Sequence, residues 1–203
     1  MPTLEETMRE IQQKLDRLER KLVSDDGPVD DVANLHSVTW THYVIGYERA
    51  AHQLFEGMHQ NGHMQNFLCF PIVFLFRHYI ELELKRLTAM AQVARNGRAD
   101  RIPVDHDLIR LWTRFESETR EFDDYSNQSA LVCERIRELS SIDSRSESFR
   151  YPIEKRGAPV FSTIERINVR NLAEIMEAIS MYFDGWDGYL DDMISNIPDY
   201  ESY

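Results

Sequence analysis

Apolar residues recur every three or four positions along most of this chain, which is the period of α-helices that bury one face. The strongest segment runs from Phe67 to about Ala94, and its first part, Phe67 to Phe76, is apolar on nearly all sides. Such a segment predicts a helix that is buried on most of its circumference. Pro71 falls in the first turns, where its missing N–H costs least, and Asn96 and Gly97 end the helix. We expect this helix to lie at the centre of the fold.

Four other segments show helical periodicity and are expected to pack around the central helix. They cover residues 34–58, 105–115, 127–140 and 168–193. No segment shows the alternation of a β-strand, and the sequence contains no internal repeat. The fold class predicted for residues 34–195 is therefore all-α, an antiparallel helical bundle.

Residues 1–26 predict a separate helix of coiled-coil type. Their apolar residues alternate at spacings of four and three, as the a and d positions of heptads do: Leu4, Met8, Ile11, Leu15, Leu18 and Leu22. Residues 24–28, Ser-Asp-Asp-Gly-Pro, end helices and form turns, so they indicate a linker. The stripe is short for a coiled coil, which leaves two arrangements open. It pairs two copies in a homodimer, which we favour, or it packs against its own bundle.

The composition describes a well-solvated acidic protein with a substantial core. Apolar residues make up 42% of the chain, and the net charge is −12 at pH 7. The acidic balance argues against broad, sequence-blind nucleic-acid binding, although a small basic cleft can still hold a phosphate. The N-terminus lacks the apolar stretch of a signal peptide, and the longest apolar run is too short to span a bilayer. We expect a cytoplasmic protein without membrane contact.

Neither the cysteines nor the histidines have the spacing of a metal site. Cys69 and Cys133 are far apart in sequence and are expected to be buried free thiols. His59 and His63 are four residues apart, but Gly62 between them disfavours a continuous helix. The sequence contains no P-loop, dinucleotide-binding, hydrolase, zincin or calcium-binding pattern. We therefore expect no metal ion and no cofactor.

Polar residues that core packing does not require gather on three segments. Arg77, Glu81 and Lys85 share one face of the central helix, and His78 lies about 100° away from Arg77. The other candidates stand near the start of the next helix and in the long segment 140–163: His106, Asp107, Arg150 and Tyr151. A helix start and a loop can both lie over a central helix, so these residues can converge on one site.

An arginine and a histidine that face one phosphodiester meet the two needs of RNA cleavage without a metal ion. The arginine stabilises the negative charge that develops, and the histidine moves a proton. On this hypothesis the catalytic residues are His78, His106, Arg77 and Arg150. The alternative is structural, because Arg77 and Glu81 have the i, i+4 spacing of an ion pair within a helix, and Arg150 can close another carboxylate pair.

Three stretches of this sequence resemble helical proteins of the HEPN superfamily: FRHYIELELKRL (76–87), HDLIRLW (106–112) and FRYP (149–152). The resemblance covers about residues 35–190. It implies an antiparallel helical bundle that often dimerises, found among toxin–antitoxin ribonucleases, phage-defence proteins and CRISPR-associated nucleases. Catalytic members carry an arginine followed about four to six residues later by a histidine. Here Arg77 and His78 are adjacent, and Arg101 with His106 meets that spacing.

The resemblance implies two functions, and the sequence leaves both open. One is a metal-independent ribonuclease of toxin or phage-defence type that acts on RNA or a nucleotide. The other is a non-catalytic module for binding or oligomerisation, with a cognate protein as its partner. Both include a homodimer, and the candidate binding residues are Glu81, Lys85, Asp107, Tyr151 and Arg101.

Overall fold

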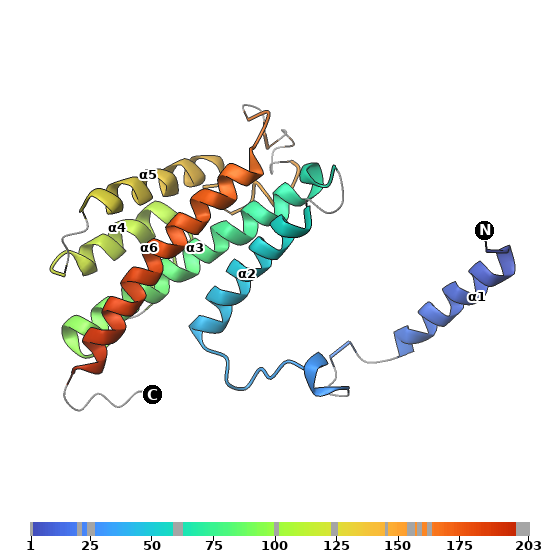
Figure 1. The fold of residues 1–203 in the computed structure, drawn as a ribbon, viewed down its shortest axis with the longest axis horizontal. Helices are drawn as coiled ribbons and strands as arrows, with labels where there is room; N and C mark the ends of the chain where they lie inside the picture. The colour runs from blue at the N-terminus through green and yellow to red at the C-terminus, as the bar shows by residue number, and fades with distance from the viewer. Residues whose placement is uncertain are drawn as a thin grey trace. The chain divides into compact units, whose positions relative to one another are not determined.

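The computed structural model describes residues 2–19, 22–23, 27–58, 63–99, 102–122, 126–144, 146–153, 157, 160–161 and 164–197. These residues form six α-helices and two short 3-10 helices, and no β-strand element occurs among them (Figure 1). The predicted all-α class is confirmed. The chain divides into two compact units, Met1–Val38 and Thr39–Tyr203.

The unit Met1–Val38 contains helix α1 (Leu4–Leu15) and two 3-10 helices, η1 (Asp16–Glu19) and η2 (Val29–Asp31). A capping box starts α1, because the Thr3 side chain accepts a hydrogen bond from Glu6 N and the Glu6 carboxylate accepts one from Thr3 N. None of the residues of α1 is buried. Its coiled-coil role stays a prediction, and residues 24–26 of the expected linker lie outside the described residues.

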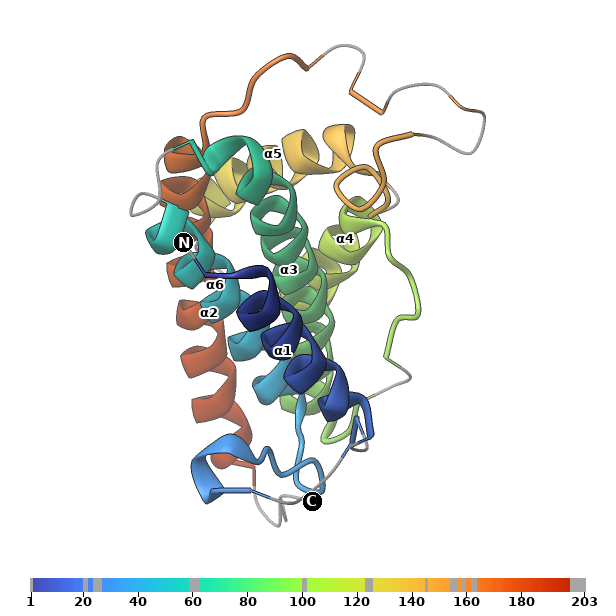
Figure 2. The same ribbon diagram turned by 90° about the vertical axis from the view of Figure 1, so that its right-hand side faces the viewer.

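The described part of Thr39–Tyr203 forms a bundle of five helices with α3 at its centre. Their bounds are α2 (Trp40–Met58), α3 (Gln65–Asn96), α4 (Leu108–Thr119), α5 (Ser126–Ile142) and α6 (Val169–Ser195). Helices α2, α4 and α6 all contact α3, whereas α5 packs on α4. Figure 2 shows α3 (green) between α2 and α6 on one side and α4 on the other. The predicted antiparallel bundle with a central helix is thus confirmed.

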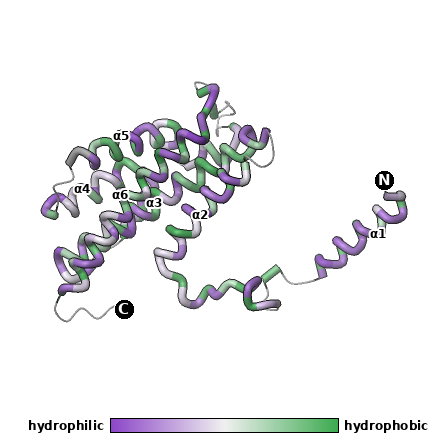
Figure 3. Tube along the Cα trace, viewed as in Figure 1, coloured by the Kyte–Doolittle hydropathy of each residue, from purple (hydrophilic) through white to green (hydrophobic). Residues whose placement is uncertain are grey.

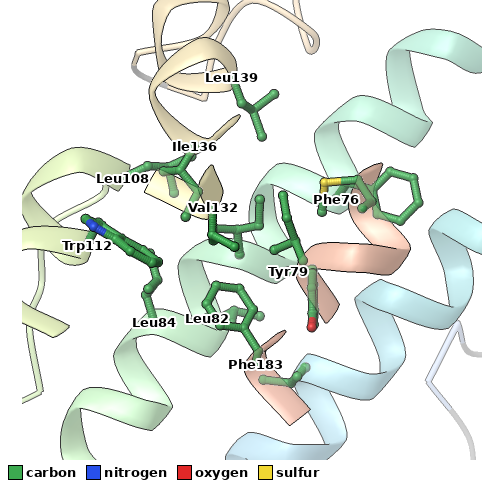
Figure 4. Close-up of a cluster of buried hydrophobic side chains, with 14 of the residues drawn as sticks. Phe76, Tyr79, Leu82, Leu84, Leu108, Trp112, Val132, Ile136, Leu139 and Phe183 are labelled. Atoms are coloured by element: carbon green, nitrogen blue, oxygen red, sulfur yellow. The ribbon is translucent and has the colours of Figure 1, made fainter. Parts of the chain in front are cut away.

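The core of this bundle forms where α3 meets its neighbours. Apolar and polar positions alternate along the helices (Figure 3), so each helix turns an apolar face inward. Figure 4 shows the buried cluster, with side chains from four helices: Phe76, Tyr79, Leu82, Leu84, Leu108, Trp112, Val132, Ile136, Leu139 and Phe183. In the part of the chain that the structure describes, none of the helices combines the length and the apolar character needed to cross a bilayer.

The start of α2 differs from the sequence prediction. The helix expected from Asn34 begins only at Trp40. The Asn34 side chain accepts a hydrogen bond from His36 N, a local turn that competes with helix formation. Thr39 then starts the helix, since Thr39 N donates to His42 Nδ1 at 3.1 Å. Local side-chain bonds therefore hold residues 34–39 out of the helix.

Candidate functional site

Arg77 lies at the centre of the candidate site and is completely buried. It stands on α3, where the apolar segment ends, and its guanidinium reaches three parts of the chain. Nε donates to the backbone oxygen of Asp143 at 3.0 Å, Nη1 to Glu81 Oε2 at 3.1 Å and Nη2 to the backbone oxygen of His106 at 2.8 Å. Arg77 therefore ties the segment before α4 and the segment after α5 to the middle of α3.

Glu81, one helical turn after Arg77, is the carboxylate that compensates this buried charge. Its second oxygen, Oε1, accepts a hydrogen bond from Lys85 Nζ at 3.0 Å and lies 2.7 Å from His106 Nδ1. Burial raises the pKa of Glu81, but the hydrogen bonds to Lys85 and His106 outweigh burial, and the net pKa is below the ordinary value. Glu81 is therefore a carboxylate anion at neutral pH.

His106 connects this buried network to solvent. Its backbone is held by Arg77, while 69% of its side chain is exposed. The sequence placed His106 in the first turn of a helix, but it lies just before the N-cap, Asp107, whose carboxylate accepts hydrogen bonds from the first amides of α4. Because Nδ1 faces Glu81, the ring nitrogen that does not contact this carboxylate is Nε2, on the opposite edge of the ring.

His78 lies beside the network and packs among aromatic rings. Its ring stacks on Phe74 with centroids 6.0 Å apart, and the ring of Tyr47 from α2 meets it edge-on at 4.3 Å. Partial burial lowers the pKa of His78, with Glu81 acting against this and the nearby cations, including His106, adding to it. Burial among these rings therefore favours the neutral form of His78.

The segment after α5 is anchored by Asp143, which has no exposed surface. Asp143 Oδ1 accepts hydrogen bonds from Glu147 N at 2.8 Å and Ser148 N at 3.0 Å. Its other oxygen, Oδ2, lies 3.6 Å from Arg77 Nε. The shape of this segment therefore depends on the same arginine that holds His106.

Arg150, which this segment carries, is an exposed cation placed over two aromatic rings. Its guanidinium carbon lies 5.6 Å from the ring centroid of Phe74 and 5.7 Å from that of Tyr151. Arg150 Nε donates to the backbone oxygen of Ser146. Within the described residues Arg150 forms no ion pair with a carboxylate. An exposed guanidinium is a side-chain type that can contact phosphate and carboxylate groups.

The sequence-predicted residues fall into three groups. Arg77, Glu81, Lys85 and His106 form one hydrogen-bonded network. His78 and Arg150 both contact the ring of Phe74. The Arg150 guanidinium also lies over the ring of Tyr151. Asp107 serves as the cap of α4. Arg101 lies outside the described residues.

Sequence reasoning missed Asp143 and Phe74. Asp143 follows a predicted helix, and an aspartate just after a helix end is typical of a turn, which is the signal that could have identified it. Phe74 belongs to the apolar run that we assigned to the core, and nothing in its spacing distinguished it. Both residues act by joining α3 to the segment that carries Arg150.

No group of three histidine, cysteine or acidic side chains within the described ranges is arranged to hold a metal ion. Both cysteines are free thiols; Cys133 is buried and Cys69 half-buried. A histidine paired with a carboxylate and an exposed arginine are residue types that can transfer a proton and contact an anion.

A second polar cluster lies among α2, α3 and α6. Arg86 donates two hydrogen bonds to the buried Glu83, at 2.9 and 2.6 Å, and one to Asp187 at 2.6 Å. Burial, together with neighbouring carboxylates, raises the pKa of Glu83 and of Asp184. This cluster carries an excess of negative charge, which distinguishes it from the site around Arg77.

No family model, no curated protein and no solved structure matches this chain.

Proposed function

We propose that this chain is a HEPN-like protein of toxin or phage-defence type that cleaves RNA without a metal ion. The observation that carries the proposal is the pairing of a buried carboxylate with an exposed imidazole, Glu81 Oε1 with His106 Nδ1 at 2.7 Å. A carboxylate on one ring nitrogen fixes the tautomer and orientation of a histidine and stabilises its protonated form. His106 is therefore the proton-transfer group of the proposal.

The proposed reaction uses the ribose of the substrate as its nucleophile. His106 Nε2 takes the proton of a 2′-hydroxyl, the 2′-oxygen bonds to phosphorus, and the bond from phosphorus to the next 5′-oxygen breaks. Water protonates the departing 5′-oxygen, and the hydroxide that this leaves takes the proton from the His106 imidazolium, so that the products are a 2′,3′-cyclic phosphate and a 5′-hydroxyl. The imidazolium that forms is stabilised by Glu81, which is ionised at neutral pH.

In this proposal the two arginines have different roles. Arg77 is buried and donates to three protein oxygens, so it positions His106 and Glu81 and does not touch the substrate. Arg150 is exposed and is the proposed contact for the phosphate, with Tyr151 beside it. His78, whose pKa is lowered, would face the substrate as a neutral imidazole.

A second candidate function is a non-catalytic HEPN-like module for binding or oligomerisation. It is favoured by the contacts of Arg77, which is buried and pairs with two buried carboxylates. Buried, mutually paired charges are typical of an ion network with a structural role. Both candidates include a homodimer held by the apolar stripe of α1, which is exposed. Deleting residues 1–26 would then shift the mass measured by light scattering toward the monomer.

The test is RNA cleavage by the purified protein in EDTA. Wild type is compared with His106→Ala, with His78→Ala and with His36→Ala, an exposed histidine of the other unit that serves as the control. The proposal expects His106→Ala to lower the rate by about 100-fold or more and His36→Ala to leave it unchanged. Thermal melting verifies that each variant is folded.

The other outcomes separate the alternatives. A loss seen only in His78→Ala would move the proton-transfer role to His78. Equal background cleavage in all four proteins would overturn the nuclease and leave the binding module.

A further inference from the structure

A long apolar groove runs between α5 and α6. Because α5 rests on α4 whereas α6 rests on α3, the two helices do not pack closely against each other. Two hollows of about 510 and 400 Å³ lie between them. The first is lined by Leu131 of α5 and by Met181 and Tyr189 of α6. The second is lined mainly by apolar residues such as Ile142 and Leu172, with Arg135, Glu138 and Asn171 also in its wall.

The side chains at the rim of the first hollow are open to solvent. Leu131 is 63% exposed, Met181 70% and Tyr189 41%. From Asn168 to Tyr189 the residues of α6 and its cap line the two hollows in succession, a length of about 30 Å at the helical rise. Apolar surface of this length and shape is typical of grooves that bind an amphipathic helix.

Helix α1 has the matching apolar face. Leu4, Met8, Ile11 and Leu15 follow the spacing of helix-in-groove anchors, and all four are exposed. The twelve residues of α1 extend about 18 Å, which is within the length of the groove.

A charge match at one end gives the helix a direction. The first turn of α1 carries Glu5 and Glu6. Arg166 lines the hollow beside the start of α6. Among the described residues Arg166 forms no ion pair. The acidic first turn of α1 meets Arg166 when α1 runs parallel to α6.

We propose that α1 of one chain binds in the α5–α6 groove of a second copy, and that two copies exchange their α1 helices. Stable interfaces bury about 1,200–2,000 Å², and one short helix contributes only part of that area, whereas a reciprocal exchange doubles the contribution. Such an exchange closes with twofold symmetry. It does not depend on whether the protein cleaves RNA.

Cross-linking of two variants tests this pairing. With Leu4 beside the start of α6, equal helical rise places Leu15 beside Met181. A tagged Leu15→Cys chain and an untagged Met181→Cys chain, both carrying Cys69→Ser, are mixed and treated with a short bismaleimide. The expected product joins the tagged and untagged chains. Val104→Cys replaces Met181→Cys in the control and is expected to give no such product, since Val104 is 71% exposed but lies outside the groove.

Three other outcomes of the cross-linking experiment would each overturn the proposal. Cross-links only between two Leu15→Cys chains would mean that α1 pairs with α1. A third chain carries Leu15→Cys and Met181→Cys together, and cross-links only within single copies of it would mean that α1 binds its own bundle. The absence of any cross-link would mean that α1 does not bind the groove.

The oligomeric state gives an independent measurement. Met181→Glu places a charge in the groove and is expected to convert most of the dimer to monomer, whereas Val104→Glu, an equally exposed substitution, is expected to leave the dimer intact. Circular dichroism confirms that both variants keep their helices. A Met181→Glu variant that is as dimeric as wild type would overturn the proposal.

Discussion

Glu81 Oε1 lies 2.7 Å from His106 Nδ1, which joins a side chain that is 2% exposed to one that is 69% exposed. The same carboxylate also pairs with Arg77 and Lys85. An isolated carboxylate at this depth would be unstable, so the three cationic or polar partners are what allow it to remain charged. The network thereby presents one histidine to solvent in a fixed orientation.

Glu81→Gln is expected to destabilise the protein strongly. Glutamine keeps the shape of the side chain but removes the nearer of the two carboxylates that pair with the buried Arg77 and leaves only Asp143, a loss of about 3 kcal/mol in the free energy of unfolding. Urea unfolding at pH 7 measures it. Glu10→Gln is the control, because the Glu10–Lys14 pair is exposed and is worth less than about 1 kcal/mol. Equal effects of the two substitutions would contradict the assignment.

The destabilisation caused by Glu81→Gln is expected to depend on pH. The pKa of Glu81 is lower in the folded protein than its ordinary value of 4.5, so its charge stabilises the fold above that value and stops doing so as the pH falls through the folded pKa. The difference in unfolding free energy between wild type and Glu81→Gln should therefore be largest near neutral pH and shrink below pH 4.5. A difference that grows in acid would refute this prediction.

The local pattern of the sequence was sufficient to predict the central helix and one face of the site. The apolar run predicted α3, and the i, i+4 spacing predicted that Arg77, Glu81 and Lys85 would lie together. Both follow from helical geometry alone. The ion pair that we kept as the structural alternative is present in the fold.

The contacts that complete the site depend on the packing of distant segments. His106 is 25 residues from Glu81, and Asp143 is 66 residues from Arg77. Whether such residues meet depends on where the segments before α4 and after α5 cross α3, and helical periodicity carries no information on that crossing. The burial of Arg77 has the same origin, since the covering segments remove it from solvent.

Arg77→Lys is expected to loosen the two segments that Arg77 holds. A lysine ammonium donates from a single point and cannot reach Glu81, Asp143 and His106 together. Hydrogen exchange should become faster in residues 103–107 and 146–151, with little change in α2. Arg120→Lys is the control, because Arg120 is exposed at the other end of α4, away from both segments. Unchanged exchange in both segments would show that other contacts hold them.

Asp184→Asn is expected to stabilise the protein slightly. Burial raises the pKa of Asp184, Glu48 and Asp187 raise it further, and Arg86 acts against them. When the pKa of a carboxyl group is higher in the folded state than in the unfolded state, ionisation of that group destabilises the folded protein. The charge of Asp184 therefore lowers the free energy of unfolding at pH 7, and this destabilisation disappears as the pH falls through the folded pKa. Because solvent screens this partly exposed group, the gain at pH 7 should be no more than about 1 kcal/mol.

Thermal melting of Asp184→Asn at a series of pH values measures this effect. The melting temperature should exceed that of wild type at pH 7, and the two should converge as the pH falls and the wild-type Asp184 becomes protonated. Glu177→Gln, an exposed substitution on the same helix, is the control and should melt with wild type throughout. A gain that persists unchanged in acid would show that the asparagine acts through a new contact, since the wild-type charge is then already gone.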